Sequence, residues 1–241
     1  PLSTWGRRFT AERTRARVDA FAVDCAALVA PMAEAGIPAD SIHVMPPGVD
    51  IAATSRDAAI VVDLPEGRPR VGYAGALERG RGLGTLVAAA PAIRERYPAA
   101  SILIAGEGTA RLGLAEAGGA GTVQLLGHVA SVPSVLAALD VCVFPSSEPG
   151  IPTPLLEAAA LGRPIVATDV PGIHELFDDG AEIVVVPRGD AWALAEAVCA
   201  LLDEPERARA IGQAARVRVI DDYATAAAAR RGMELVHALA R

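Results

Sequence analysis

From about residue 70 onward, short apolar runs alternate with longer segments in which apolar and polar residues are mixed. The runs are rich in Val, Ile and Leu and end in Gly, Pro or charged residues, as strands do. Apolar strands separated by helices are typical of a parallel sheet covered on both faces. The pattern therefore predicts an α/β fold with a doubly wound parallel sheet. We expect its strands at 70–75, 101–105, 122–126, 141–144, 164–168 and 182–186.

The mixed segments predict the helices of this domain, at 82–96, 110–117, 132–139, 155–161, 192–203 and 205–220. The first 70 residues follow this alternation of strands and helices less regularly. They predict strands at 18–23 and 42–45 and a helix at 25–36, and the polar stretch 54–69 carries Pro and Gly as a linker does. We therefore expect a compact domain at 70–220 with incomplete structure at both of its ends. The first 70 residues precede it, and a long amphipathic helix at 225–241 follows it.

Composition narrows the function classes. Hydrophobic residues make up 52% of the 241 residues and aromatics only 4%, so the core is expected to consist of Ala, Val, Leu and Ile. A formal net charge of −7 argues against a nucleic-acid partner, whose binding surface would be basic. No apolar run reaches membrane-spanning length. Cys25, Cys142 and Cys199 are odd in number and far apart, which favours reduced cytosolic thiols over disulfides or a zinc site.

The segment 144–169 is the most informative for chemistry. A buried strand ends in Pro-Ser-Ser, and a helix opens on Pro154, where a missing N–H has no cost. The free N–H groups and positive dipole end of such a helix attract phosphates. Glu148 precedes the turn and Glu157 lies among apolar residues inside the helix, although a solvent-facing glutamate is the commonest alternative. A phosphate-attracting turn flanked by two acids suits a ligand with both phosphates and sugar hydroxyls.

Other candidates follow the earlier strands. Gly75 to Gly82 joins the first strand to its helix, where glycines let amides approach a phosphate and Arg81 can bind it bidentately. A flexible turn with solvated arginines is an equal alternative, since neither dinucleotide-binding G-x-G-x-x-G nor phosphate-loop G-K-S/T is present. Glu107 follows the second strand on the expected ligand side of the sheet, but a plain strand-to-helix turn explains it slightly better than a ligand contact. His128 is typical of a surface residue, but the backbone of His128 and Val129 can read a base edge.

Other enzyme classes find no support. His174 and Glu175 are expected to cap or orient a short helix rather than to react. The chain has no H-E-x-x-H, no His/Cys cluster with metal spacing and no G-x-S-x-G, so the sequence gives no case for a metalloenzyme or a serine hydrolase.

Taken together in order, these motifs resemble the carboxyl-terminal half of retaining glycosyltransferases with the GT-B fold, in particular glycosyltransferase family 4. The resemblance rests on AGIPADSIHVMPPGVD, VGYAGALERGRGL, LIAGEG, LLGHV and ALDVCVFPSSEPGIPTPLLEAAALGRPIVATDVPGIHEL, and covers nearly the whole chain. It implies a Rossmann-like domain for nucleotide sugars at 70–220 and a linker at 49–69. Residues 1–48 would be the end of the amino-terminal acceptor domain with its crossover, and 221–241 a helix packing back toward that part.

The resemblance also implies roles for individual residues. Gly75 and Arg81 would meet the donor diphosphate, His128 and Val129 the nucleobase, and Glu157 the ribose hydroxyls. Glu148 would lie near the donor sugar and, with Arg81, count as catalytic. Further backbone or hydroxyl contacts to the sugar and phosphates would come from Gly150, Ile151 and Thr153. No metal or cofactor is implied, because the helix dipole and basic side chains offset the leaving-group charge.

The sequence departs from the family's pattern in three places. Eight residues separate Glu148 from Glu157, where the family has seven, and Ala76 stands where an Arg often binds phosphate. Most of the acceptor-binding domain is absent from the sequence, which would fit a fragment or one half of a split enzyme with a separate amino-terminal half.

The expected function is sugar transfer from a nucleoside-diphosphate sugar to a hydroxyl of a glycan, lipid or small-molecule acceptor, with retention. Two alternatives stay open: a nucleotide-sugar epimerase of the same fold, and a non-catalytic nucleotide-sugar-binding or assembly module. The expected location is cytoplasmic, at the inner face of the membrane if the acceptor is a lipid.

Overall fold

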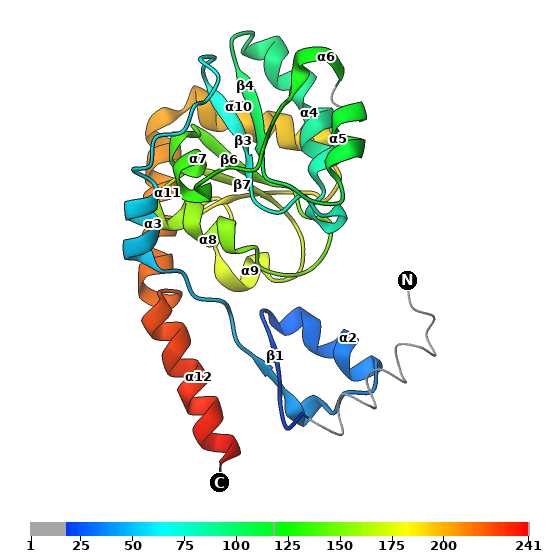
Figure 1. Ribbon diagram of the computed structural model, residues 1–241, viewed down its shortest axis with the longest axis vertical. Coiled ribbons are helices and arrows are strands. Elements are labelled where there is room, and N and C mark those ends of the chain that lie inside the picture. Colours follow the sequence, from blue (N-terminus) through cyan, green and yellow to red (C-terminus); the bar gives the residue numbers. More distant parts are fainter. Residues whose placement is uncertain (1–17, 118, 241) are drawn as a thin grey trace.

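The computed structural model describes residues 18–117 and 119–240. Its main domain is built on six parallel strands in the order β5–β4–β3–β6–β7–β8 (Figure 1). These strands are β3 (Arg70–Ala74), β4 (Ser101–Ala105), β5 (Gln124–Gly127), β6 (Val141–Phe144), β7 (Ile165–Thr168) and β8 (Val184–Val186). The predicted doubly wound parallel sheet is therefore confirmed, and each predicted strand of this domain is present, with ends shifted by a few residues.

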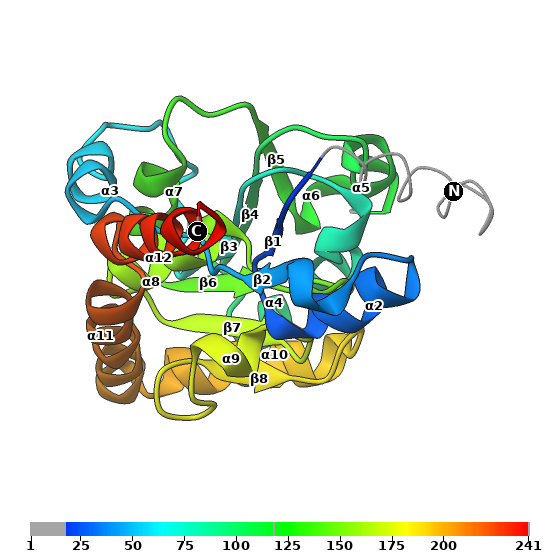
Figure 2. The same cartoon turned by 90° about the horizontal axis from the view of Figure 1, so that it is seen from below.

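The strand order reverses beside β3. The chain steps outward from β3 through β4 to β5, and then returns to lay β6 on the other side of β3 (Figure 2). Gly72 pairs with Leu103 of β4 on one side and with Cys142 of β6 on the other. In doubly wound sheets, ligands bind at such a reversal, beyond the carboxyl ends of the strands.

Helices cover both faces of this sheet. One face carries α4 (Leu83–Arg96), α5 (Arg111–Ala117), the short α6 (Gly119–Thr122) and α10 (Ala191–Asp203). The other carries α3 (Ile51–Asp57), α7 (Val132–Ala138), α8 (Thr153–Ala160) and α11 (Pro205–Asp222). The predicted linker is thus interrupted by α3, whose start is capped by Asp50: its carboxylate accepts a hydrogen bond from the Ala53 N–H at 2.9 Å.

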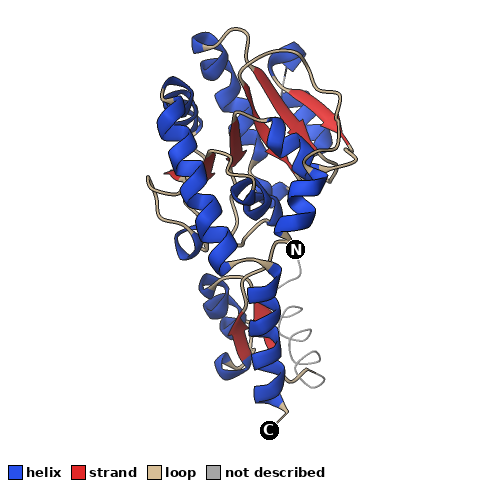
Figure 3. Cartoon of the chain, turned by 90° about the vertical axis from the view of Figure 1, so that its left-hand side faces the viewer, coloured by secondary structure: helices blue, strands red, loops and turns tan. Residues whose placement is uncertain are grey.

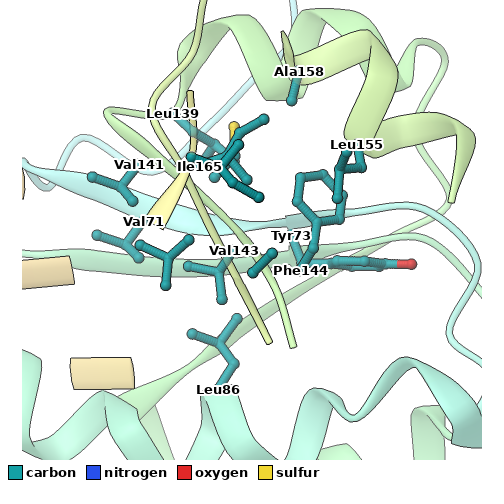
Figure 4. Packing of buried hydrophobic residues seen from close by; sticks show 14 of the residues in the cluster. Val71, Tyr73, Leu86, Leu139, Val141, Val143, Phe144, Leu155, Ala158 and Ile165 are labelled. Atoms are coloured by element: carbon teal, nitrogen blue, oxygen red, sulfur yellow. The ribbon is translucent and has the colours of Figure 1, made fainter. Parts of the chain in front are cut away.

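The core lies between these layers. Figure 4 shows Leu155 of α8 and Leu86 of α4 on opposite sides of the β3 and β6 side chains. Both leucines are fully buried, and burial of one such side chain contributes about 1.5–3 kcal/mol. Tyr73 and Phe144 meet edge to face, with ring centroids 5.7 Å apart, directly beneath the carboxyl ends of β3 and β6. This aromatic pair therefore packs under the end of the sheet at which a ligand would bind.

A smaller unit precedes the main domain. It contains β1 (Phe21–Val23) and β2 (Ile42–Val44), which pair in parallel, together with α2 (Val29–Glu34) and the 3₁₀ turns η1 (Ala26–Leu28) and η2 (Ala39–Ser41). Buried Val23, Ile37 and Ile42 form a cluster separate from the main core. The predicted strands and helix of this region are therefore present, while residues 1–17 of the predicted 1–48 segment lie outside the described residues.

The last helix, α12 (Thr225–Leu239), extends from the same end of the main domain as the small unit (Figures 1 and 3). Residues on either side of its start pair with the crossover: the Thr225 N–H donates to the Val49 carbonyl at 3.0 Å. Further along, Arg231 donates to the Pro46 carbonyl at 3.4 Å. None of the residues in α12 is buried, and Met233, Val236 and Leu239 are exposed. In the described ranges, no helix combines the length and the apolar character that crossing a membrane requires.

Candidate functional site

A pocket of about 430 Å³ opens at the carboxyl ends of β3, β4 and β5, beside the start of α8. It lies at the strand-order reversal, where the topology favours a ligand. Elements far apart in sequence converge on it: the ends of three strands, α7 and α8. Its lining residues are Gly75, Ala76, Gly106, Glu107, His128, Val129, Val132, Thr153, Pro154 and Glu157.

The floor of this pocket is made of interlocked backbone. The Gly75 N–H donates to the Ala105 carbonyl at 3.0 Å, and the Gly106 N–H donates to the Gly127 carbonyl at 2.7 Å. Gly106 has φ +130°, and a Cβ atom added there would lie 1.9 Å from the Gly75 carbonyl oxygen. Only glycine fits at this position. Strands β3, β4 and β5 are thus locked to one another at the end where the pocket opens.

Tyr73 supports the floor from beneath. Its side chain is buried, and its hydroxyl donates to the Ala76 carbonyl at 2.9 Å. Burial raises the pKa of Tyr73 to about 12, and the positive charge of Arg81 opposes the shift. The hydroxyl therefore stays protonated at neutral pH and holds the turn that follows β3. Sequence reasoning missed this residue, because a tyrosine inside an apolar strand predicts only packing.

The wall opposite the strand ends is the first turn of α8. Pro152 precedes the helix, no side chain caps it, and a proline lies in its first turn. The positive end of the helix dipole therefore faces the region where Thr153 and Pro154 line the pocket. A helix start of this kind is suited to a phosphate or another anion.

Glu157 lies one turn further along α8, half-buried at the pocket wall. Burial raises the pKa of its carboxyl group, and the negative charge of Asp57 on α3 raises it further. Within the described ranges no basic side chain forms an ion pair with Glu157. A carboxylate held in this way has lost water without gaining a protein partner, so hydroxyl donors of a ligand would compensate it. Nothing in the sequence pointed to Asp57, which lies in the predicted linker.

The structure brings together Gly75, His128, Val129, Thr153 and Glu157, but places the other predicted residues around the pocket rather than in its lining. Arg81 is half-buried in the 3₁₀ turn η3 (Arg79–Arg81). This turn is tied to the loop after β6, because the Ser147 N–H donates to the Gly80 carbonyl at 2.9 Å. Glu148 is exposed and lies against Gly80, where an added Cβ would be 2.6 Å from its carboxyl carbon.

Gly150 and Ile151 are buried outside the lining of the pocket and lie against Asp24 of the small amino-terminal unit. The Ile151 N–H donates to the Asp24 carboxylate at 2.9 Å. Glu175, in the short helix α9 (Ile173–Leu176), also faces that unit, and its carboxylate accepts hydrogen bonds from two N–H groups of η1. The sequence predicted that Glu175 caps or orients a short helix; it does cap one, but the capped turn lies 148 residues or more away in sequence.

A larger cavity of about 660 Å³ lies at the opposite end of the sheet. It is lined by residues that precede the strands, including Pro69, Asp140 and Pro164, and by the end of α10 and the start of α11. One of its arginines, Arg68, is already paired with Asp140 at 3.2 Å. The topology therefore favours the smaller pocket. Among the residues that the structure describes, no cluster of His, Cys, Asp and Glu is arranged to hold a metal ion.

Comparison of the sequence with known protein families identifies the family of this chain. Residues 68–204, more than half of the chain, match the family described as Glycosyl transferases group 1. The chain is 33% identical over 167 residues to a glycogen synthase of Mycobacterium tuberculosis, covering 65% of this chain and 40% of that protein. It is 33% identical over 197 residues to a GDP-mannose-dependent alpha-(1-6)-phosphatidylinositol monomannoside mannosyltransferase of the same organism, covering 74% of this chain and 51% of that protein.

Solved structures agree on the fold. The chain is similar to HepE of Anabaena, solved with UDP and glucose, with a TM-score of 0.81 and 18% identity. That likeness covers 98% of this chain and 67% of HepE. The chain spans about half the length of the curated relatives it matches.

Proposed function

Because the chain belongs to the group 1 glycosyl transferases, we propose that it is the donor-binding half of an enzyme that transfers a sugar from a nucleoside diphosphate to a hydroxyl acceptor with retention of configuration. One observation carries the proposal: the half-buried Glu157, which has no ion-pair partner among the described residues, and the start of α8 line the same pocket as the glycine floor. A carboxylate and a helix N-terminus side by side match a ligand that carries both hydroxyls and phosphates.

The nucleotide would lie across the strand ends. Its base would contact the backbone of His128 and Val129, and its ribose hydroxyls would donate to Glu157. The diphosphate would lie between Gly75 and the first turn of α8, with Arg81 approaching from η3. This order follows the lining of the pocket from β5 to α8.

Catalysis would depend on the departing diphosphate. As the bond between the sugar C1 and the diphosphate oxygen breaks, negative charge grows on that oxygen; the acceptor oxygen bonds to C1, and its proton passes to the departing diphosphate. The helix dipole of α8 and the guanidinium of Arg81 would stabilise this charge without a bound metal ion. Glu148 would approach the donor sugar from the loop that is tied to η3.

The remaining acceptor contacts would come from an amino-terminal half, in the same chain or a separate one. The small unit and the exposed apolar side chains of α12 provide a surface on which such a half would pack. HepE was solved with UDP, and the similar mannosyltransferase depends on GDP-mannose, so both classes of donor need testing.

Calorimetric titration of the chain with UDP, GDP and ADP tests the donor site. We expect one of them to bind, and Glu157→Ala to weaken that binding about tenfold, roughly the loss of one hydrogen bond to a charged group. The matched control is Glu196→Ala, since Glu196 is an exposed helix glutamate on α10 outside the pocket. Equal affinities for wild type and Glu157→Ala would remove the assignment.

Retention needs a separate measurement on the complete enzyme. Proton NMR of the first product formed from an α-linked donor should show an α-linkage. A β-linked product would contradict retention, and conversion of the donor sugar to an epimer without acceptor would favour the epimerase alternative.

A further inference from the structure

The small amino-terminal unit reaches the loop that leads into the pocket. Asp24 directly follows β1, and its Oδ2 accepts a hydrogen bond from the Ile151 N–H at 2.9 Å. Ile151 is 7% exposed and lies two residues before Thr153, where α8 begins. A carboxylate from the small amino-terminal unit therefore contacts the backbone that leads into the pocket wall.

The loop is shaped to receive this carboxylate. Gly150 has φ +123°, a conformation that other residues rarely adopt, and a Cβ added there would lie 3.2 Å from Asp24 Oδ2. Its own N–H donates to the Pro171 carbonyl at 3.3 Å, which ties the loop to the segment after β7. Any side chain at position 150 would thus crowd Asp24 and change the path of the loop.

Stability alone does not explain Asp24. Among the described residues, nothing donates a hydrogen bond to its second oxygen, Oδ1, although this atom is buried. A buried acceptor without a partner costs free energy. An aspartate that carries this cost while one oxygen holds a loop amide is suited to positioning.

The same interface contains a second carboxylate that points the other way. Glu175, from the main domain, accepts hydrogen bonds from the Ala26 N–H at 2.8 Å and the Ala27 N–H at 3.3 Å. Cys25 lies between the two acids: the pKa of its buried thiol is raised mainly by burial and then by the charges of Asp24 and Glu175. Both acids join the two units, but Glu175 lies on α9 and outside the lining of the pocket.

We propose that Asp24 is a positioning residue for the donor site: by holding the Ile151 amide, it fixes the start of α8 and thereby Thr153, Pro154 and Glu157. The small amino-terminal unit and the pocket are coupled through this bond. The inference rests on the proposed function in naming a nucleoside diphosphate as the ligand, but the coupling itself concerns only the protein.

The first experiment compares Asp24→Ala with Glu175→Ala in the full chain. Each removes one carboxylate from the same interface. Titration uses whichever of UDP, GDP and ADP binds the wild type most tightly. We expect Asp24→Ala to weaken binding about tenfold and Glu175→Ala to change it less than about twofold. Asp24→Asn should restore most of the affinity, because its amide oxygen can still accept the Ile151 N–H. Equal losses in both alanine variants, or no loss in Asp24→Ala, would overturn the proposal.

The second experiment needs no ligand. Amide hydrogen exchange should become faster at 150–157 in Asp24→Ala and stay at the wild-type rate there in Glu175→Ala, whose effect should be confined to 25–28. Gly150→Ala displaces the carboxylate without removing it, and should speed exchange at 150–157 even if Asp24→Ala fails to fold. Unchanged exchange at 150–157 in the Asp24 and Gly150 variants that fold would contradict the coupling.

The two experiments separate the two claims. If no nucleotide binds the wild type, the proposed function fails while hydrogen exchange still decides the role of Asp24. If a nucleotide binds with equal affinity to wild type and Asp24→Ala, the proposed function stands and the positioning role fails.

Discussion

The two ends of the sheet carry two cavities of different character. The one at the amino ends of the strands is larger, about 660 Å³ against about 430 Å³, and contains three arginines. The smaller one has a floor of interlocked backbone, an uncapped helix start and a half-buried carboxylate. Size and positive charge therefore do not identify the site here. The direction of the strands favours the smaller cavity, because ligands of doubly wound sheets bind beyond the carboxyl ends of the strands.

The largest effect on stability and binding should come from a substitution in the backbone floor of the pocket. Gly106→Ala would place a methyl group 1.9 Å from the Gly75 carbonyl oxygen, so β3 and β4 would have to separate at their ends. We expect a loss of about 3 kcal/mol in the free energy of unfolding and loss of nucleotide binding. Denaturant titration measures the first. Gly113→Ala is the control, since nothing lies within 4 Å of a Cβ there and alanine should slightly stabilise α5. Similar behaviour of the two variants would show that the floor is not rigid.

An arginine from each end tests which cavity binds the donor. Arg81→Ala should weaken nucleotide diphosphate binding about tenfold, because a cation near the phosphates is lost. Arg209→Ala removes an arginine from the larger cavity and should leave the affinity unchanged. Calorimetry measures the nucleotide affinity of both variants. Weaker binding in Arg209→Ala and unchanged binding in Arg81→Ala would place the site at the other end of the sheet.

Removing a tyrosine hydroxyl near either end of the sheet should have a smaller effect on stability. Tyr73→Phe removes the hydrogen bond to Ala76 under the pocket, and Tyr97→Phe removes the one to Asp203 near the amino end of β4. Each should cost about 1 kcal/mol of unfolding free energy. Only Tyr73→Phe should also weaken nucleotide binding, which titration would reveal. An affinity change in Tyr97→Phe instead would mean that the two ends are coupled.

The smallest expected effect concerns pH. Since burial and Asp57 raise the pKa of Glu157, its ionised form is disfavoured in the folded chain. Its contribution to stability is therefore present at low pH and lost as pH rises through the raised pKa. Glu157→Gln should slightly raise the thermal midpoint at neutral pH and yet weaken binding.

The same shift predicts how binding depends on pH. Affinity in the wild type should fall as pH decreases toward the raised pKa, because only the ionised carboxylate accepts from both ribose hydroxyls. Asp57→Asn should move that fall to lower pH. Calorimetry across the acidic range measures both, and a pH-independent affinity would contradict the role of Glu157.

The sequence predicted local features well and contacts between distant segments poorly. The four central strands, β3, β4, β6 and β7, were predictable because each is a largely apolar run that is buried almost throughout. Glu157 and the start of α8 were found because a proline-led helix after a buried strand is a local pattern. The positions of Gly75, His128 and Val129 followed from topology, since residues that end parallel strands meet at one edge.

What escaped prediction depends on contacts across the chain. Asp24 and Ile151 are 127 residues apart, and only the packing of the small unit brings them together. Asp24 did carry one usable signal, because it directly follows a predicted strand. Asp57 lies on a helix inside the predicted linker, and its effect on Glu157 arises only when α3 packs on α8. The placement of Glu148 against Gly80 depends on how one loop folds over another.

The backbone floor of the pocket limits how donor choice can be altered. Main-chain groups present the same hydrogen-bonding pattern whatever side chains surround them, so substitutions cannot readily redesign that surface. Selectivity among donors would then be adjustable mainly at the rim, where Glu107, His128 and Thr153 are exposed. A library of variants at those three positions would explore new donors while leaving the free energy of unfolding almost unchanged.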